Sequence, residues 1–381
     1  MKTHAAVLWG RGQDWQIEEI ELDPPTSREV LVRWGAAGLC HSDEHLRHND
    51  LGSEAPGQPP RAGLFPMVGG HEGGGVVVEV GPNVDSLALG DHVAASFFPV
   101  CGRCKMCITG HSNLCDLGAA TFAPGQISDG TDRYHLEGAE SLSIMAKLGT
   151  FAEYSVCHED SLVKVDADLP LGAVALVSCG VMTGWGSAVY RAQVMPGDTV
   201  VVVGIGGVGI NAVQGARMVG AKHIVAVDPI EFKQKSALDF GATHAVGSMD
   251  EAVPIVTELT RGQMADAVIM VPGVMYGDLM AGALALTGKG GTCVVTGVAP
   301  QRQSECSVNL FDLAMMQKEI KGVIFGAGNP RFDIPNLLSL YKSGQLKLDE
   351  LITRTYALDQ INQGYQDMLD GVNLRGVVTF D

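Results

Sequence analysis

The fold of the second half of the chain is decided by residues 199–209, which read TVVVVGIGGVG. Residues 199–203 form a continuous β-branched run, and such a run is typical of a parallel strand that is buried on both faces. Glycines in the spacing G-x-G-x-x-G follow at once, and residues 210–219 continue with a helical pattern. The stretch therefore predicts a strand, a tight turn and a helix.

The glycine spacing also predicts a dinucleotide site at this turn. Gly204 would make the turn, Gly206 would let the backbone reach a pyrophosphate, and Gly209 would let the helix pack closely on the strand. The first amide groups of the helix would face the phosphates. A tight turn without any ligand is the alternative.

An acidic residue in the right place favours NAD as the dinucleotide. Asp228 follows nineteen residues after Gly209, at the end of the next predicted strand, where its carboxylate would accept hydrogen bonds from the adenosine ribose. The 2′-phosphate of NADP would instead meet this negative charge. Lys233 is expected to touch a ribose. The cofactor-binding residues predicted here are Gly204, Gly206, Gly207, Val208, Gly209, Asp228 and Lys233.

Strands and helices alternate around this stretch. Residues 221–228, 265–271 and 291–297 each have the pattern of a further parallel strand. We therefore expect residues 181–324 to form a doubly wound α/β domain with a parallel sheet.

The N-terminal part has a different pattern. Apolar and polar residues alternate within residues 5–35, and strand-like runs continue around the turns at 81–84 and 90–93. This predicts a β-rich, partly barrel-like domain over residues 1–180. We expect the tail, residues 325–381, to return to that first domain. A chain of 381 residues is too long for one ordinary core, which also favours two domains.

The composition argues against several classes of function. The formal net charge is −17, which disfavours a nucleic-acid surface or an anionic membrane as a partner. The N-terminus lacks a secretory hydrophobic region, and no apolar run is expected to reach membrane-spanning length. We therefore expect a cytoplasmic protein, in which the nine cysteines are metal ligands and free thiols rather than disulfides.

The stretch Cys40–His45, which reads CHSDEH, combines a thiol, two imidazoles, a hydroxyl and two carboxylates. Thiolate and imidazole are good zinc ligands, but one short segment cannot close a tetrahedral site. His71, in a glycine-rich run, and Cys179, after an apolar run, are candidate partners. Together with Cys40 they would give two sulfurs and one nitrogen with a fourth position open, as at a catalytic zinc. Alternatively, both cysteines are ordinary buried thiols and His71 is a core histidine.

A second group of cysteines is the most specific motif in the chain. Four thiols in the spacing C-x2-C-x2-C-x7-C predict a metal site, because closely spaced thiols in a reducing compartment have few other uses. Four protein ligands leave no position for a substrate, so we expect a structural zinc. An iron–sulfur cluster is the competing interpretation, and disulfides are a third. The four residues are Cys101, Cys104, Cys107 and Cys115.

With two apparent zinc sites flanking a dinucleotide fold, the sequence resembles the zinc-dependent medium-chain alcohol dehydrogenases over essentially its whole length. Within that family it is most similar to the nicotinoprotein, nitrosoaniline-dependent alcohol dehydrogenases of actinobacteria, which keep NAD(H) as a prosthetic group. This subgroup similarity rests on Trp9-Gly10 and on residues 38–45, 204–216 and 317–322.

The resemblance implies a GroES-like catalytic domain, a Rossmann domain, two Zn²⁺ per chain and NAD(H). It implies hydride transfer between an alcohol, expected to be primary, and an NAD that is recycled in place. A small-molecule alcohol or aldehyde would be the substrate, with a further redox acceptor and a homo-oligomeric assembly.

The resemblance also implies roles for the residues of the first cysteine stretch. The catalytic zinc ligands fall on Cys40, His71 and Cys179, and the structural ligands on the four clustered cysteines. Glu72 is expected to approach the metal, and Asp43 to orient the ligand histidine. Ser42 falls on the hydroxyl that receives the substrate proton, and His45 on the outer end of the relay. Alternatively, Ser42 or Asp43 caps a helix and the histidines lie at the surface.

Other positions match cofactor and substrate contacts of the family. His41 and Arg375 fall on contacts with the cofactor pyrophosphate, and Thr183 lies beside the nicotinamide. The wall of the substrate pocket falls on Phe97, Val298 and Ile324, and Val298 is also assigned as a cofactor contact.

Three rival functions remain. A glutathione-dependent formaldehyde dehydrogenase uses an arginine four residues after the last structural cysteine, where this chain has Ala119, although another thiol cofactor could use other contacts. An ordinary alcohol dehydrogenase would exchange its NAD. A non-catalytic NAD-binding protein is disfavoured because Ser42, His45 and all three catalytic ligands are present.

Overall fold

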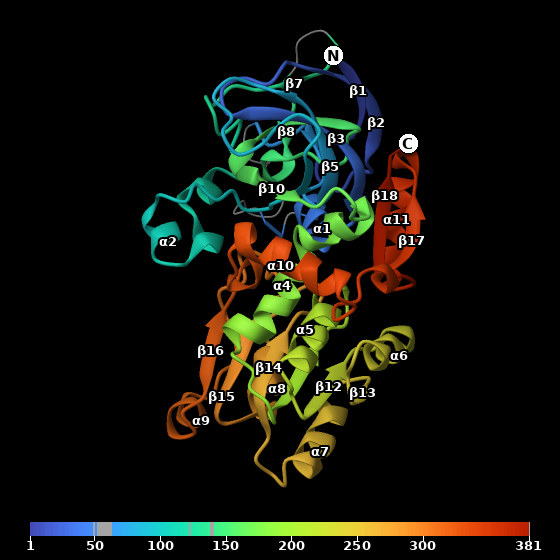
Figure 1. The fold of residues 1–381 in the computed structure, drawn as a ribbon. Coiled ribbons are helices and arrows are strands. Elements are labelled where there is room, and N and C mark those ends of the chain that lie inside the picture. The colour runs from blue at the N-terminus through green and yellow to red at the C-terminus, as the bar shows by residue number, and fades with distance from the viewer. Residues whose placement is uncertain (49, 52–62, 122, 138–140, 381) are drawn as a thin grey trace. The chain divides into compact units, whose positions relative to one another are not determined.

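The computed structural model describes residues 1–48, 50–51, 63–121, 123–137 and 141–380 (Figure 1). The chain forms two compact units: the first consists of Met1–Cys179 and Asn329–Asp381, and the second of Gly180–Gly328. The sequence placed the return to the first domain at residue 325. The turn Phe325–Ala327 stays with the second unit because it packs on the helix α4 (Gly180–Gly186), where a Cβ on Gly186 would lie 2.3 Å from the carbonyl oxygen of Gly326.

The first unit contains two mainly antiparallel sheets. One has the strand order β7-β2-β1-β4-β8, and the other has the order β10-β6-β5-β3-β18-β17, with β9 also paired to β3. The strands are β1 (Lys2–Leu8), β2 (Gln16–Leu22), β3 (Glu29–Gly38), β4 (Met67–Val68), β5 (Gly73–Val80), β6 (His92–Ala95), β7 (Tyr134–His135), β8 (Ser143–Ile144), β9 (Tyr154–His158), β10 (Leu162–Val165), β17 (Ile352–Tyr356) and β18 (Arg375–Thr379). The helices are α1 (His41–Arg47), α2 (Lys105–Ile108), α3 (Leu171–Val177), α10 (Pro330–Lys342) and α11 (Ile361–Leu369).

The strand pairing brings three segments that are distant in sequence to one edge of the larger sheet, where its central strands β3, β5 and β18 end or begin. Antiparallel pairing joins the end of β3 to the start of β5 and to β18. Cys40 follows β3 by two residues, His71 precedes β5 by two residues, and Arg375 begins β18. The tail of the chain therefore returns to the first unit, where it completes this edge.

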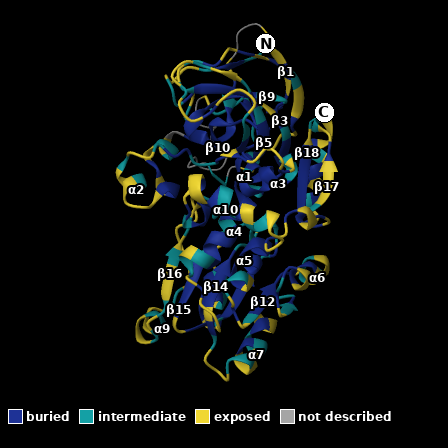
Figure 2. Ribbon diagram, viewed as in Figure 1, coloured by how far each residue is buried: buried dark blue, intermediate teal, exposed yellow. Residues whose placement is uncertain are grey.

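Glycines let the elements around this edge approach closely. A Cβ on Gly73 would lie 2.8 Å from the Trp34 ring, and one on Gly74 would lie 2.3 Å from the carbonyl oxygen of Leu171 in α3. Any larger residue would push β5 away from the core beneath it. Trp34 itself is buried, and the dark strands of Figure 2 show how much of this sheet is enclosed.

The second unit is a doubly wound α/β fold (Figure 1). Its parallel sheet has the order β13-β12-β11-β14-β15-β16, which is the strand order of a dinucleotide-binding fold. The strands are β11 (Thr199–Val203), β12 (His223–Val227), β13 (His244–Val246), β14 (Ala265–Met270), β15 (Thr287–Val295) and β16 (Glu319–Gly322). Besides α4, the helices are α5 (Gly207–Met218), α6 (Glu231–Asp239), α7 (Met249–Leu259), α8 (Leu279–Leu286) and α9 (Leu310–Met315). The predicted fold class is therefore confirmed.

One helical run, Leu171–Arg191, is long and apolar enough to cross a membrane by length and composition alone. Of its most apolar window, 83% is buried inside the protein, which is the property of a core helix. Within this run α3 ends at Val177 and α4 begins at Gly180.

Candidate active site

Four metal-binding side chains meet at the shared edge of the first unit. The thiols of Cys40 and Cys179, a ring nitrogen of His71 and a carboxylate oxygen of Glu72 all lie within 4.8 Å of one another. All four residues are buried, and both cysteines are free thiols. The ring of Phe97 packs against His71, with 5.3 Å between the ring centroids. The structure thus brings together the dispersed residues that the sequence singled out.

The cluster fits a zinc ion. Nε2 of His71 has no hydrogen-bond partner although its side chain is fully buried, and such a group costs free energy unless something binds it. Two thiols and one imidazole with a further open position are the ligand set of a catalytic zinc. A plain core histidine would leave this nitrogen unsatisfied, so the geometry disfavours that alternative.

Asp43 lies beside the other ring nitrogen of His71, at ion-pair distance but without a well-aligned hydrogen bond. Its Oδ2 lies 3.1 Å from Nδ1 of His71, and its Oδ1 accepts a 3.0 Å hydrogen bond from the amide of Gly70. Burial alone would lower the pKa of His71, but the charges of Asp43 and Cys40 outweigh it and raise the pKa. Asp43 does not cap α1, because the residue at the N-cap is Cys40. The carboxylate is therefore placed to orient the histidine and leave Nε2 as the ligand atom.

Glu72 is paired with a buried arginine that sequence reasoning assigned elsewhere. Arg375 forms an ion pair with Glu72 and donates to the carbonyl oxygen of Leu39 at 3.1 Å. Burial raises the pKa of Glu72 to about 7, although the charge of Arg375 opposes this rise. The two residues lie 303 positions apart, and no spacing signal joins them. The expected contact of Arg375 with a pyrophosphate stays a prediction.

Helix α1 carries the hydroxyl and imidazoles that follow Cys40. Ser42 and His45 lie three residues apart, so their side chains are neighbours on one face of the helix. The hydroxyl of Ser42 is 3.6 Å from the thiol of Cys40. His45 is buried rather than at the surface, its ring centroid is 5.0 Å from that of His41, and its Nδ1 lies 2.8 Å from Oδ2 of Asp50. Sequence reasoning missed Asp50, whose only signal was a carboxylate five residues after His45.

The second cysteine cluster fits a tetrahedral zinc. The sulfurs of Cys101 and Cys107 are 4.0 Å apart, and those of Cys104 and Cys115 are 3.9 Å apart. Two sulfurs at about 2.3 Å from one tetrahedral zinc would lie about 3.8 Å from each other. All four thiols are free, so the disulfide alternative does not hold.

Backbone amides favour the thiolate at Cys104 of this second cluster, whereas burial raises the pKa of Cys107 and raises that of Cys115 to about 12. Hydrogen bonds from the amides of Asp116 and Cys107 lower the pKa of Cys104 to about 6. The amide of Cys104 in turn donates to the sulfur of Cys101 at 3.3 Å. Because a metal binds the thiolate form, these amides favour a cation at Cys104, and a bound metal would have to displace the protons of the other thiols.

The turn between β11 and α5 has the shape that the glycine spacing predicts. Gly204 has a φ of +91°, and a Cβ on Gly209 would lie 1.8 Å from the carbonyl oxygen of Gly204. A Cβ on Gly206 would meet nothing within 4 Å, so the backbone there is open to a ligand. Helix α5 begins without a side-chain cap, which suits an anion at its first amides. The turn therefore fits a dinucleotide pyrophosphate.

Asp228 is fixed beside this turn by two amides. Its Oδ2 accepts from Ile205 at 2.8 Å and its Oδ1 accepts from Ile230 at 2.9 Å. Each oxygen keeps a further lone pair, so a ribose hydroxyl could still donate to it. Other predicted cofactor residues lie in the same unit, and their contacts with a cofactor stay predictions. They are Thr183 at α4, Gly207 and Val208 at the start of α5, Lys233 in α6, and Val298 after β15.

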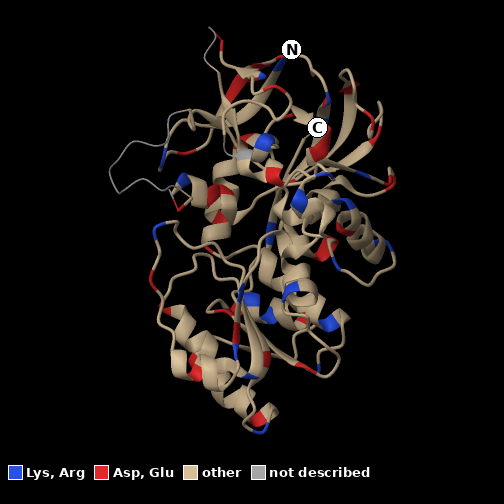
Figure 3. Cartoon of the chain, turned by 90° about the vertical axis from the view of Figure 1, so that its left-hand side faces the viewer, with Lys and Arg blue, Asp and Glu red and all other residues tan. Residues whose placement is uncertain are grey.

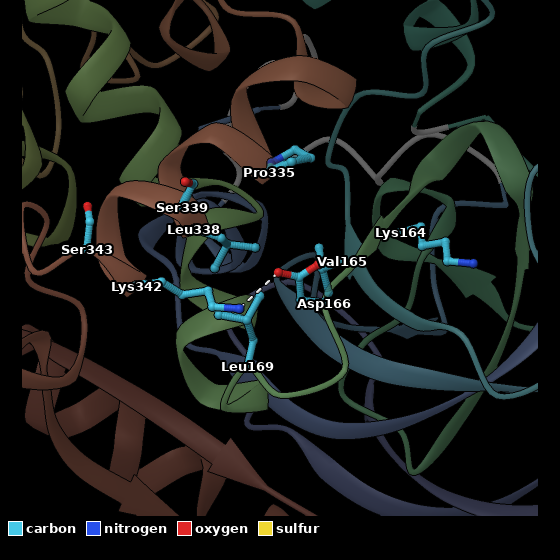
Figure 4. A pocket seen from close by; sticks show the side chains of 9 residues that line it. All are labelled: Lys164, Val165, Asp166, Leu169, Pro335, Leu338, Ser339, Lys342 and Ser343. Carbon is cyan, nitrogen blue, oxygen red and sulfur yellow. Dashed lines mark hydrogen bonds and ion pairs between the residues drawn. The ribbon is translucent and has the colours of Figure 1, made fainter.

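The surface groove drawn in Figure 4 carries none of this chemistry. It has a volume of about 530 Å³ and lies between β10 and α10. The amine of Lys342 is paired there with Asp166 and Asp168, at 3.0 Å each. None of the predicted site residues lines this groove. Elsewhere, acidic and basic residues are interspersed along both units (Figure 3).

Comparison with known proteins agrees with this geometry. Residues 26–167 match the model of the alcohol dehydrogenase GroES-like domain, and residues 207–343 match that of the zinc-binding dehydrogenases. The chain is 50% identical over 378 residues to an NDMA-dependent alcohol dehydrogenase from Amycolatopsis methanolica, covering 99% of each chain.

Two solved structures have the same fold over the full length. An alcohol dehydrogenase zinc-binding domain protein from Burkholderia ambifaria has a TM-score of 0.91 at 32% identity, covering 100% of this chain and 99% of the other. The benzyl alcohol dehydrogenase of Acinetobacter calcoaceticus has a TM-score of 0.89 at 31% identity and covers 100% of both chains. Both zinc-ligand clusters, the dinucleotide turn and these full-length matches lead to one conclusion: the chain belongs to the zinc-dependent medium-chain alcohol dehydrogenases, oxidoreductases that use zinc and NAD.

Proposed function

We propose that this alcohol dehydrogenase oxidises a primary alcohol to an aldehyde with an NAD that stays bound and is reoxidised in place by a second acceptor. The observation that carries the proposal is the buried cluster of Cys40, His71 and Cys179, in which the Nε2 atom of the histidine has no partner. The A. methanolica relative is named an NDMA-dependent alcohol dehydrogenase, and the subgroup that this sequence resembles is reoxidised by nitrosoaniline dyes as external acceptors. An external electron acceptor is needed when NAD does not leave the enzyme, so this similarity supports recycling in place.

In this proposal the three ligands hold a catalytic zinc, which when bound supplies a Lewis acid that polarises the substrate oxygen. Asp43 keeps the imidazole of His71 oriented by its contact with Nδ1. Arg375 keeps Glu72 from carrying an uncompensated charge beside the thiolates. The four clustered cysteines hold a second zinc with no free position, and that metal stabilises its loop.

Ser42 and His45 are proposed to move the proton that leaves the substrate hydroxyl. The Ser42 hydroxyl lies beside the thiol of Cys40, at the border of the cluster. His45 is buried on the same helix face, and an imidazole takes up and releases protons near neutral pH. A bound NAD would accept the hydride from the same alcohol carbon, so the two-electron oxidation would release one proton for these two residues to move.

The cofactor contacts follow from the second unit and from the residues assigned by resemblance. We propose that the glycine turn binds the pyrophosphate and that Asp228 binds the adenosine ribose. His41 and Arg375 are proposed to contact the pyrophosphate, and Thr183 the nicotinamide.

We also propose a cytoplasmic homo-oligomer. Leu310, Phe311 and Met315 of α9 are 73%, 72% and 63% exposed, and β16 is an edge strand of its sheet. Exposed apolar residues beside a sheet edge are features that a second copy would cover. Light scattering on the purified protein should give a mass above that of one chain, and a monomer would contradict this part of the proposal.

The test of cofactor retention is a measurement on the purified protein. Acid denaturation should release about one NAD(H) per chain, and a primary alcohol such as benzyl alcohol should be oxidised with a nitrosoaniline dye as the acceptor. Added NAD should be reduced slowly, because exchange is limited by the off-rate. A protein that purifies without nucleotide and rapidly reduces added NAD would contradict retention, and would leave the assignment of the zinc ligands intact.

A further inference from the structure

His45 and Asp50 form a close pair at the end of α1. Nδ1 of His45 lies 2.8 Å from Oδ2 of Asp50, and the two side chains are 3% and 20% exposed. The amide of Asp50 also donates to the carbonyl oxygen of His45 at 2.8 Å. Asp50 therefore contacts both the ring and the main chain of the same residue, which fixes the carboxylate relative to the imidazole.

The surrounding turn is held by backbone hydrogen bonds. The amide of His48 donates to the carbonyl oxygen of Glu44 at 2.8 Å, and the amide of Gly12 donates to that of Arg47 at 3.0 Å. Asp14 adds an ion pair with Arg47 at 2.7 Å on the outside of the helix. The end of α1 thus has several attachments, so the contact between Asp50 and His45 is not what holds the helix in place.

We propose that Asp50 is a positioning residue for proton transfer: it keeps the hydrogen of neutral His45 on Nδ1, leaves Nε2 as the acceptor, and stabilises the imidazolium that forms. This inference rests on the proposed role of His45. A neutral imidazole has one donor and one acceptor nitrogen, and the partner of one nitrogen decides which is which. The proton from the alcohol hydroxyl passes through Ser42 to Nε2 of His45 and then to solvent, so no further reactant is needed.

Asp50 and His41 are ionisable groups that face the His45 ring. Asp50 lies at Nδ1, and the His41 ring lies on the preceding turn at a centroid distance of 5.0 Å. The carboxylate of Asp50 accepts a hydrogen only from Nδ1, so it selects the tautomer whose Nε2 is free to accept a proton. Removing the carboxylate should therefore leave the tautomer unfixed and slow proton transfer through Nε2.

The test compares Asp50→Asn with a matched control. Asp14→Asn removes a carboxylate that is ion-paired to the same helix but does not touch His45. For benzyl alcohol oxidation with a nitrosoaniline acceptor, Asp50→Asn should lower kcat about tenfold with little change in KM, because general acid–base transfer through a fixed tautomer is lost. Asp14→Asn should leave both unchanged. Zinc content of two per chain and an unaltered unfolding temperature would show that each variant is intact.

A double variant separates positioning from a structural role. In a His45→Gln background, Asp50→Asn should have no further effect, because the two residues act as one unit. An equal loss of kcat in both backgrounds, or a wild-type kcat in Asp50→Asn, would overturn the inference. If His45→Gln itself has a wild-type kcat, the proposed role of His45 is wrong, and the inference about Asp50 is withdrawn with it.

The tautomer of His45 can also be measured in the wild-type protein, so this test does not depend on the folding of a variant. In addition to His71, whose Nδ1 faces Asp43, a second ring, that of His45, should show its hydrogen on Nδ1 by NMR of the ¹⁵N-histidine-labelled protein at pH 8. That signal should be absent in His45→Gln and should change to mixed tautomers in Asp50→Asn. A His45 signal with the hydrogen on Nε2 in the wild-type protein would contradict the inference.

Discussion

The two zinc-ligand clusters of the first unit are built in opposite ways. Residues 101–115 supply all four thiols of one cluster from a single loop, and three of the four are only partly buried. The other cluster joins Cys40, His71 and Cys179 from three segments, is fully buried, and is backed by Asp43 and by Arg375 through Glu72. A closed site made of local residues can stabilise a loop by itself. An open site instead needs several segments of the domain to position its ligands, and buried charged residues around the ligands to orient them and balance their charge.

The largest expected effect is on the open cluster. Cys179→Ser should reduce alcohol oxidation on the order of 10³-fold or more, because Lewis-acid stabilisation worth several kcal/mol is lost with the metal. Metal analysis should find one zinc per chain instead of two, while the unfolding temperature stays close to that of the parent protein. The buried thiol of Cys157, which belongs to neither cluster, provides the control, and Cys157→Ser should keep both metals. Two zinc ions and full activity in Cys179→Ser would contradict the ligand assignment.

The closed cluster should respond through stability instead. Cys104→Ala should lower the free energy of unfolding by about 4 kcal/mol, because the binding energy of a structural metal is folding energy. Denaturant unfolding measures this change, and Cys306→Ala, which removes an exposed thiol, serves as the control. If Cys104→Ala were as stable and as active as the parent, the loop would not have the structural role assigned to it.

A smaller effect is expected from replacing Asp43, the buried carboxylate beside the zinc ligand His71. Asp43→Asn should weaken zinc binding or activity by roughly 10- to 100-fold, since the amide orients His71 less well and carries no charge. Competition with a chelator measures the affinity. Glu44→Gln changes a neighbouring buried carboxylate that pairs with Arg47 rather than with a ligand, so it should affect stability without selective loss of zinc. Equal zinc loss in both variants would show that Asp43 has no special role.

Local patterns in the sequence predicted the elements whose structure is set by neighbouring residues. The β-branched run became β11, and α5 begins at Gly207, three residues earlier than expected, because the glycine turn itself starts the helix. The four-cysteine spacing gave the closed cluster directly. In each case the side chains that meet are close in sequence, so spacing alone carries the information.

Such local patterns could not predict contacts between segments that are distant in the sequence. The pair of Glu72 and Arg375 depends on β18 lying beside β3, a pairing that forms only when the tail returns to the first unit. Asp50 was missed for a different reason, because its contact with His45 depends on how the chain leaves α1. Residue types alone made Cys40, His71 and Cys179 candidate zinc ligands, with buried thiols and a core histidine as the alternative, and the family resemblance added the roles expected for Glu72, Asp43, Ser42 and His45 around them.

The smallest expected effect concerns pH and comes from Lys147, a buried residue of the same unit that belongs to neither cluster. Its amine donates to the carbonyl oxygens of Ala123 and Gly125, and burial lowers its pKa from 10.5 to about 8. Between those two values the unfolded chain holds a proton that the folded chain lacks, so stability should rise with pH across this window. The stability that the zinc clusters contribute is instead lost at acidic pH, because acid protonates their ligands and releases the metals.

Relative to Lys147→Met, the wild-type protein should therefore gain on the order of 2 kcal/mol of unfolding free energy between pH 8 and pH 10. The difference between the two proteins isolates the amine, since both share the thiols, such as Cys157, whose titration has the opposite sign. Urea unfolding at several pH values with zinc present in excess measures it. Parallel pH profiles for the two proteins would show that Lys147 titrates as it does in the unfolded chain, and the alkaline behaviour of this unit would then have to come from its thiols alone.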